Sequence, residues 1–152
     1  MLPDWSPNVH PLIVHFPIAL FVVAALVDGV ALTLRQRYAW MRASATGLYA
    51  LAALGAAAAF LTGRDASDHV ALPIAAVATL GAHADWALYL VWFASLYAAA
   101  RLVTLWRVPT PSLRIDGPLA AVGLVSLLLV VQTAERGGEL VYRHGVGVAA
   151  VP

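Results

Sequence analysis

The stretch LIVHFPIALFVVAALVDGVALTL, residues 12–34, decides the class of protein to which this chain belongs. An α-helix crosses the hydrocarbon core of a bilayer with about 20 apolar residues. This stretch is long enough, and only His15, Pro17 and Asp28 interrupt it. Three further apolar stretches follow, at residues 43–62, 86–105 and 118–134. The sequence therefore predicts an all-α membrane protein, a bundle of four transmembrane helices.

The composition favours the same class. Apolar residues make up 62% of the 152 residues and charged residues 11%, whereas soluble domains contain about 45–50% and about 25%. We expect a single integral membrane domain over residues 1–152, and no tandem repeat is evident along it.

The net charge of +1 gives no reason to expect nucleic acid as a partner, and the absence of Cys excludes disulfides and thiolate metal sites. Because the chain starts without the basic residues of a signal peptide, we expect the first stretch to be kept as an anchor.

A fifth apolar stretch, residues 70–82, is too short to span a bilayer and contains Pro73. We expect a short interfacial helix before the third span. A re-entrant segment and an extension of the third helix are the alternatives.

The arginines predict which side of the membrane each loop faces, because Arg in short loops is retained on the cytoplasmic side. The first and third loops hold six of the nine basic residues. These six are Arg35, Arg37, Arg42, Arg101, Arg107 and Arg114. We therefore expect these two loops inside and both termini outside.

All the histidines fall at the outer ends of the expected helices. The five are His10, His15, His69, His83 and His144. The same side carries three arginines, Arg64, Arg136 and Arg143. Ionisable groups in a bilayer are costly, usually face the bundle interior and mark function. We therefore predict a polar site at the outer face.

Haem b is the cofactor that suits this site, since two imidazoles from different helices are a usual axial pair in helix bundles. We predict His15 with His83 as the first ligand pair and His10 with His144 as the second, for one or two haems. The three outer arginines would bind the propionates. The alternative is that these histidines are interfacial or capping groups.

Glycines shape two segments of the predicted site. The second predicted helix carries Gly47, Gly55 and, at its end, Gly63, which would let a flat ring or another helix approach closely. In the tail, four glycines permit tight turns, namely Gly137, Gly138, Gly145 and Gly147. We expect the tail to fold over the helix ends as a cap, with His144 facing His10 or His15.

Asp28 lies deep in the first apolar stretch, where an unpaired carboxylate would cost roughly 2.5–3.5 kcal/mol on insertion scales. Arg101 lies near the end of the third stretch, toward the same side of the membrane. We predict a structural ion pair between them, with a proton relay as the less favoured alternative.

Two motifs resemble those of an uncharacterised bacterial family of four-helix membrane domains. The segment HPLIVHFPIAL, residues 10–20, fits the opening motif HPxxVHFPIAL, and GGELVYRHGVGV, residues 137–148, fits the closing motif GGxLVYxHGxGV. Asp28 and His83 also match the family pattern, so the resemblance spans nearly the whole chain. That family is known as a domain of unknown function.

The resemblance implies respiratory electron transfer, because some family members are fused to or lie beside Rieske-type iron–sulfur and c-type cytochrome domains. It favours haem ligation by the four histidines in the matching motifs, His10, His15, His83 and His144. We expect a small b-type cytochrome-like subunit of the bacterial inner membrane, passing electrons between quinol and a periplasmic partner. It would be an electron-transfer subunit more than a stand-alone enzyme, in a homo-oligomer or a larger complex.

Two other functions remain open from the residues. One is a metal-ion-binding or ion-handling membrane protein, since His, Asp and Glu together suit several transition metals. The other is a non-catalytic accessory subunit of a respiratory complex. The sequence shows no glycine-rich phosphate loop and no nucleophile–base spacing, so we expect neither a nucleotide enzyme nor a hydrolase.

Overall fold

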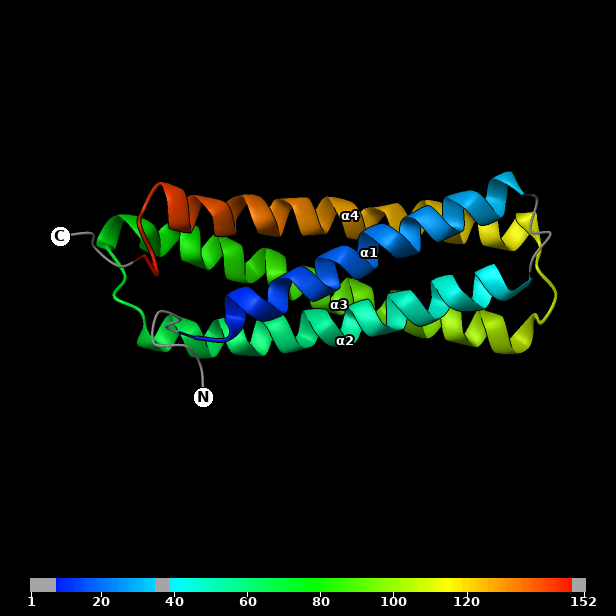
Figure 1. Cartoon of the computed structure of the whole chain (residues 1–152), viewed down its shortest axis with the longest axis horizontal. Helices are drawn as coiled ribbons and strands as arrows, with labels where there is room; N and C mark the ends of the chain where they lie inside the picture. The colour runs from blue at the N-terminus through cyan, green and yellow to red at the C-terminus, as the bar shows by residue number, and fades with distance from the viewer. Residues whose placement is uncertain (1–7, 35–38, 149–152) are drawn as a thin grey trace.

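The computed structural model describes residues 8–34 and 39–148, and these residues form a bundle of four long helices (Figure 1). The helices are α1 (His10–Thr33), α2 (Ala39–His69), α3 (Val77–Arg107) and α4 (Leu113–Tyr142), with a 3₁₀ turn η1 (Ile74–Ala76) before α3. They run up and down, so the start of α1 and the end of α4 lie at one end of the bundle. This arrangement confirms the four-helix fold expected from the apolar stretches.

Consecutive helices pack side by side around the bundle, and α4 closes the ring against α1. The helices α1 and α3 are therefore diagonal to each other, as are α2 and α4. We call the end with the start of α1 the histidine end and the opposite end the ion-pair end.

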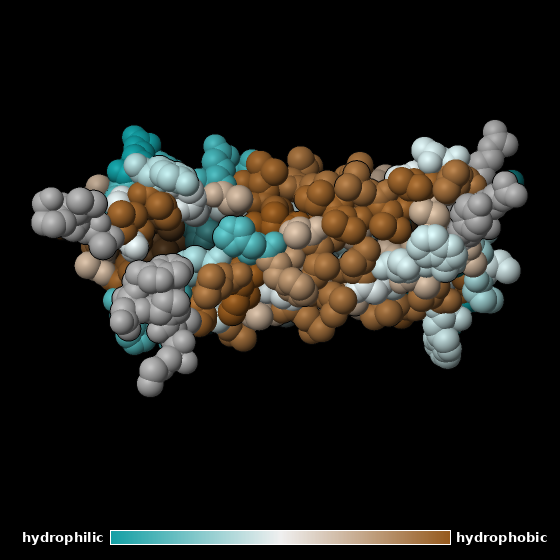
Figure 2. Space-filling view, viewed as in Figure 1, coloured by the Kyte–Doolittle hydropathy of each residue, from teal (hydrophilic) through white to brown (hydrophobic). Residues whose placement is uncertain are grey.

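The outside of the bundle is apolar, and all four helices are long and apolar enough to cross a membrane. Each helix exposes large aliphatic side chains, among them Leu26 (62% exposed), Leu54 (69%), Leu96 (67%) and Leu128 (66%). In Figure 2 the apolar surface covers the middle of the visible face and the polar residues gather toward its ends. Soluble monomers rarely expose so large an apolar surface, so the chain is a multi-pass membrane protein.

The last three helices are longer than their apolar stretches, because a helix continues past the hydrocarbon core into the polar interface. The helix α4 begins at Leu113, so Pro118 lies inside it and not at its first turn. It also runs through Gly137 and Gly138, where the sequence predicted turns. Since the backbone of a helix satisfies its own hydrogen bonds, glycine is tolerated in helices at a membrane.

The apolar stretch 70–82 is divided between two elements. The short helix expected before the third span is the single turn η1, which follows Pro73 in extended conformation. Residues 77–82 are the first turns of α3, so most of the stretch extends the third helix. Proline suits this start, because it lacks the N–H that a helix interior would need.

Small residues let the four helices approach closely in the core. Alanines fill most buried positions, and the large buried side chains lie between them, mainly Phe21, Tyr49, Leu90 and Tyr97. In a membrane, close backbone contact of this kind contributes packing energy that lipid cannot replace.

Candidate functional site

Polar side chains in the bundle interior form two layers. The histidine layer consists of the half-buried His10 on α1 and His83 on α3, and the ion-pair layer of the buried Asp28, Arg42, Arg101 and Asp116. On α1 and on α3 the two layers are 18 residues apart, which is about 27 Å along a helix. This separation is close to the roughly 30 Å thickness of the hydrocarbon core.

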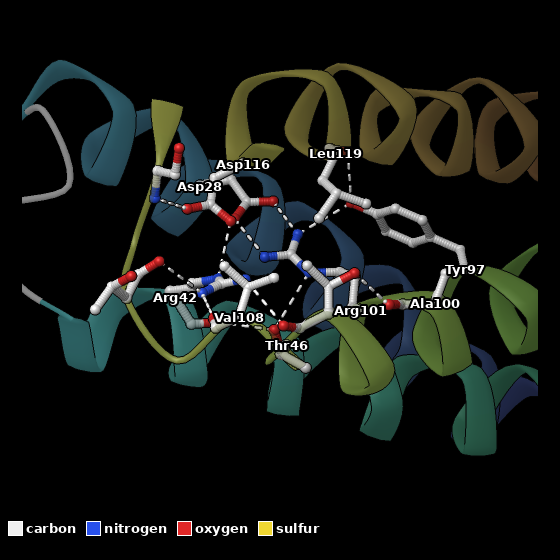
Figure 3. Close-up of polar contacts among 12 residues, drawn as sticks. Asp28, Arg42, Thr46, Tyr97, Ala100, Arg101, Val108, Asp116 and Leu119 are labelled. Carbon is white, nitrogen blue, oxygen red and sulfur yellow. Dashed lines mark hydrogen bonds and ion pairs between the residues drawn. The ribbon is translucent and has the colours of Figure 1, made fainter. Parts of the chain in front are cut away.

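The ion pair expected between Asp28 and Arg101 is present and joins the diagonal helices α1 and α3 (Figure 3). Arg101 Nη1 contacts Asp28 Oδ2, and Nη2 donates to Oδ1 at 2.8 Å. The guanidinium also donates to Tyr97 Oη at 3.0 Å and to Thr46 Oγ1 at 3.3 Å. Both charges are thus compensated and hydrogen-bonded, as burial requires.

A second buried ion pair joins the other diagonal, α2 to α4, between Arg42 Nε and Asp116 Oδ1 at 2.8 Å. Arg42 also donates to the carbonyls of Thr104 (3.3 Å) and Val108, so it binds the C-terminal end of α3. A cation at this position is favoured by the partial negative charge of a helix C-terminus.

Sequence reasoning missed the second pair. The positive-inside argument places both Arg42 and Arg101 in cytoplasmic loops, yet the side chains of both are buried in the bundle. The available signal was the charge of Asp116 just before an apolar stretch, two residues from Pro118.

Two tyrosines continue the ion-pair layer toward the middle of the bundle. Tyr49 and Tyr97 meet edge to face at 4.8 Å between ring centroids, and Tyr97 Oη donates to the carbonyl of Leu119 at 2.7 Å. Tyr49 Oη is buried and has no hydrogen-bond partner among the described residues. Gly123 on α4 provides the space for both hydroxyls, since a Cβ there would lie 2.6 Å from Tyr97 Oη.

Replacing Gly123 by Ala is therefore expected to destabilise the bundle by about 1–3 kcal/mol, the usual cost of overpacking a core. Gly117→Ala on the same helix is the matched control, because nothing lies within 4 Å of a Cβ at that position. Unfolding of the two variants in detergent, followed by circular dichroism, measures the difference. Equal stability of the two variants would contradict the packing at Gly123.

The two imidazoles of the histidine layer are held in the same way. His10 Nδ1 lies 2.9 Å from the carbonyl oxygen of Ala59, and His83 Nδ1 lies 3.0 Å from that of Thr133. Since a carbonyl only accepts, Nδ1 carries the hydrogen and Nε2 keeps its lone pair. Within the described residues neither Nε2 has a hydrogen-bond partner.

Each of these rings packs against a glycine of the neighbouring helix. A Cβ at Gly63 would lie 2.9 Å from His10 Cε1, and a Cβ at Gly137 would lie 3.1 Å from His83 Cε1. The space over Gly63 is thus filled by the imidazole of His10. The glycines and the carbonyls together fix the orientation of both imidazoles.

The other predicted ligands lie elsewhere. His15 is exposed and its Nδ1 bonds to the carbonyl of Pro11 at 2.7 Å. His144 Nε2 lies 3.4 Å from Thr79 Oγ1, at the start of α3. Among the described residues no hydrogen bond joins His15 to His83 or His144 to His10, so both pairings stay predictions. His10 and His83 lie at the same end of the bundle, on the diagonal helices α1 and α3.

Helix geometry explains why His10 and His15 face different directions. Five residues of an α-helix turn by about 140°, since each turn takes 3.6 residues. Because His10 faces α2, His15 must point away from it, toward the outside of the bundle.

The three predicted propionate-binding arginines do not form one cluster. Arg64 is exposed, and Arg143 is exposed and pairs with Glu139 at 2.8 Å on its own helix. Arg136 stacks over Trp86, one turn from His83, at 5.1 Å from the ring centroid. It also lines an open cleft between α3 and α4 with Thr79, Glu135 and Glu139, among others. Arg64 and Arg136 are each adjacent in sequence to a glycine that contacts an imidazole of the histidine layer, Gly63 and Gly137 respectively.

The glycine-rich tail forms a turn later than expected. Gly145 (φ 65°) and Gly147 (φ 74°) adopt the left-handed conformation that favours glycine. Val146 N donates to the carbonyl of Leu140 at 2.9 Å, which turns the chain back at the end of α4.

The described part of the chain contains no group of three or more His, Asp or Glu side chains that could hold a metal ion. Within residues 8–34 and 39–148, His10 and His83 are therefore not joined by a third His, Asp or Glu in such a group.

One comparison with known proteins gives a match. A family model described as "Predicted membrane protein (DUF2231)" matches residues 6–150. No curated protein and no solved structure matches the chain.

Proposed function

Since this chain belongs to the DUF2231 family of predicted membrane proteins, we propose that it works within the membrane as a small b-type cytochrome-like subunit. It would bind haem at the histidine end by bis-His ligation and transfer electrons. The histidine layer carries this proposal, because it offers two matched imidazoles and, among the described residues, no group of three metal-ligating side chains.

The number of ligands favours haem over a bare metal ion. A structural zinc site takes four protein ligands, and a catalytic one takes three. Haem iron receives its equatorial nitrogens from the macrocycle and needs only axial ligands from the protein. His10 and His83 therefore suffice for haem but not for zinc.

The way the imidazoles are held also fits iron. A ligating histidine usually donates its other ring N–H to a carbonyl or carboxylate, which fixes the tautomer and ring orientation. The Nδ1 atoms of His10 and His83 meet carbonyls in this way, and both Nε2 atoms have no partner in the described bundle. A haem held there would supply one-electron redox chemistry, and Arg136 would bind a propionate.

We propose that the subunit passes electrons between quinol in the membrane and a periplasmic partner of the Rieske or c-type cytochrome kind. We propose that the histidine end faces the periplasm of a bacterial inner membrane, with both termini outside. With Arg42 and Arg101 buried, the charge bias comes from the remaining loop arginines. These are Arg35 and Arg37, which lie outside the described residues, with Arg107 and Arg114.

The direct test is an absorption spectrum of the detergent-purified protein, oxidised in air and then reduced with dithionite, with metal analysis of the same sample. We expect a Soret band that shifts on reduction and a sharp α-band. A colourless sample with bound zinc or copper would replace the proposal by metal handling. A colourless and metal-free sample, unchanged when haem is supplied, would leave the accessory subunit.

A further inference from the structure

We infer that the chain consists of two equivalent helical hairpins, α1–α2 and α3–α4, related by a twofold axis along the bundle and sharing one cofactor site. The site has one imidazole from each hairpin, so it takes a single metal-centred ligand. The shared site rests on the proposed function, whereas the twofold relation rests on the geometry of the bundle alone.

The histidine layer repeats with a constant offset. His10 and His83 are 73 residues apart, and the glycines that they contact, Gly63 and Gly137, are 74 apart. In each hairpin the carbonyl bound by Nδ1 belongs to the residue four positions before that glycine. The two hairpins thus hold their imidazoles by the same set of contacts.

Residues of the ion-pair layer are separated in sequence by the same two offsets. Asp28 and Arg101 are 73 residues apart, and Arg42 and Asp116 are 74 apart. Each charged residue therefore pairs with its own equivalent in the other hairpin. In a twofold arrangement a residue touches its own equivalent only beside the axis.

A third contact between equivalents lies between the two layers. Tyr49 and Gly123 are 74 residues apart, and the hydroxyl of Tyr49 occupies the space over Gly123. The axis therefore passes down the middle of the bundle, between the diagonal helices. Since His10 and His83 are equivalent across the same axis, they lie on opposite sides of it, and the shared site is placed between them.

The charges distinguish the two hairpins. Two copies of the first hairpin would place Asp28 against Asp28 and Arg42 against Arg42, whereas the actual pair of hairpins places opposite charges together. Like charges without compensation are strongly unfavourable in a buried position. The chain thus specifies pairing of its first hairpin with its second.

A charge exchange in the full chain tests the twofold relation without any cofactor. Asp28→Arg alone sets two cations side by side, and we expect it to abolish the folded, monodisperse protein in detergent. Adding Arg101→Asp exchanges the charges between equivalent positions, and we expect it to restore folding and at least half of the lost melting temperature. A double variant as defective as the single one would overturn the equivalence of the hairpins.

Cofactor stoichiometry tests the shared site. We expect one haem per chain by pyridine haemochrome assay, and equal changes in spin state or haem content from His10→Ala and His83→Ala. Two haems per chain, or an effect from only one histidine, would overturn the shared site and leave haem binding standing. A wild-type chain without haem would overturn the proposed function and the shared site together, and the charge exchange would still decide the twofold relation.

Discussion

Replacing His83 by Ala is expected to reduce the haem content of the purified protein at least tenfold, and His10→Ala is expected to do the same. Each imidazole is oriented by a backbone carbonyl and a glycine contact, so a substitute ligand from solvent would lack that orientation. The ratio of Soret to protein absorbance, measured after purification with haem supplied, gives the effect directly.

His15→Ala is the matched control for this loss. It removes an exposed imidazole from the same helix as His10, and its ring bonds only to the carbonyl of Pro11 within the described structure. We expect its haem content to equal that of the unmodified chain. Loss of haem in His15→Ala, with retention in His83→Ala, would reverse the ligand assignment.

Arg101→Met is expected to destabilise the bundle by about 3–5 kcal/mol, the usual cost of leaving a buried charge without its partner. Asp28 would then lose both hydrogen bonds to the guanidinium, and Tyr97 and Thr46 would lose a donor. Unfolding in mixed detergent, followed by circular dichroism, provides the measurement.

Two further variants control this prediction. Arg107→Met removes an exposed arginine from the same helix, whose contact within the described structure is with Trp106, and is expected to change stability by less than about 0.5 kcal/mol. The double variant Asp28→Leu with Arg101→Met removes both buried charges, and we expect it to recover most of the loss. If the double variant recovers no stability, the loss in Arg101→Met comes from its hydrogen bonds to Tyr97 and Thr46 and not from the unpaired carboxylate of Asp28.

Hydropathy alone was enough to predict the four helices, because lipid demands a continuous apolar stretch for each span. The pair Asp28–Arg101 was also predictable, since each charge stands within such a stretch and needs a partner. Arg42 and Asp116 lie just outside the apolar stretches, where a buried charge and a loop charge look alike in sequence. Their pairing becomes visible only once α2 and α4 are known to be diagonal.

The histidine layer shows a different limit of sequence reasoning. All its residues were recognised, but the choice of partners depended on which face of α1 carries His10 and where α4 ends. Because α4 continues through Gly137, that glycine contacts His83 instead of forming a turn. The repeat between the hairpins is not evident in the sequence, because its matching positions are far apart and some of them carry opposite charges.

The 18-residue separation of the two polar layers also bears on the choice of lipid. Hydrophobic matching favours a bilayer whose hydrocarbon core is about as thick as the apolar span, and mismatch costs fractions of a kcal/mol per ångström. In a bilayer of shorter acyl chains the bundle would tilt. A bilayer of longer acyl chains would have to become thinner around the bundle. Acyl-chain length thus becomes a variable that adjusts the depth of His10 and His83 below the water interface.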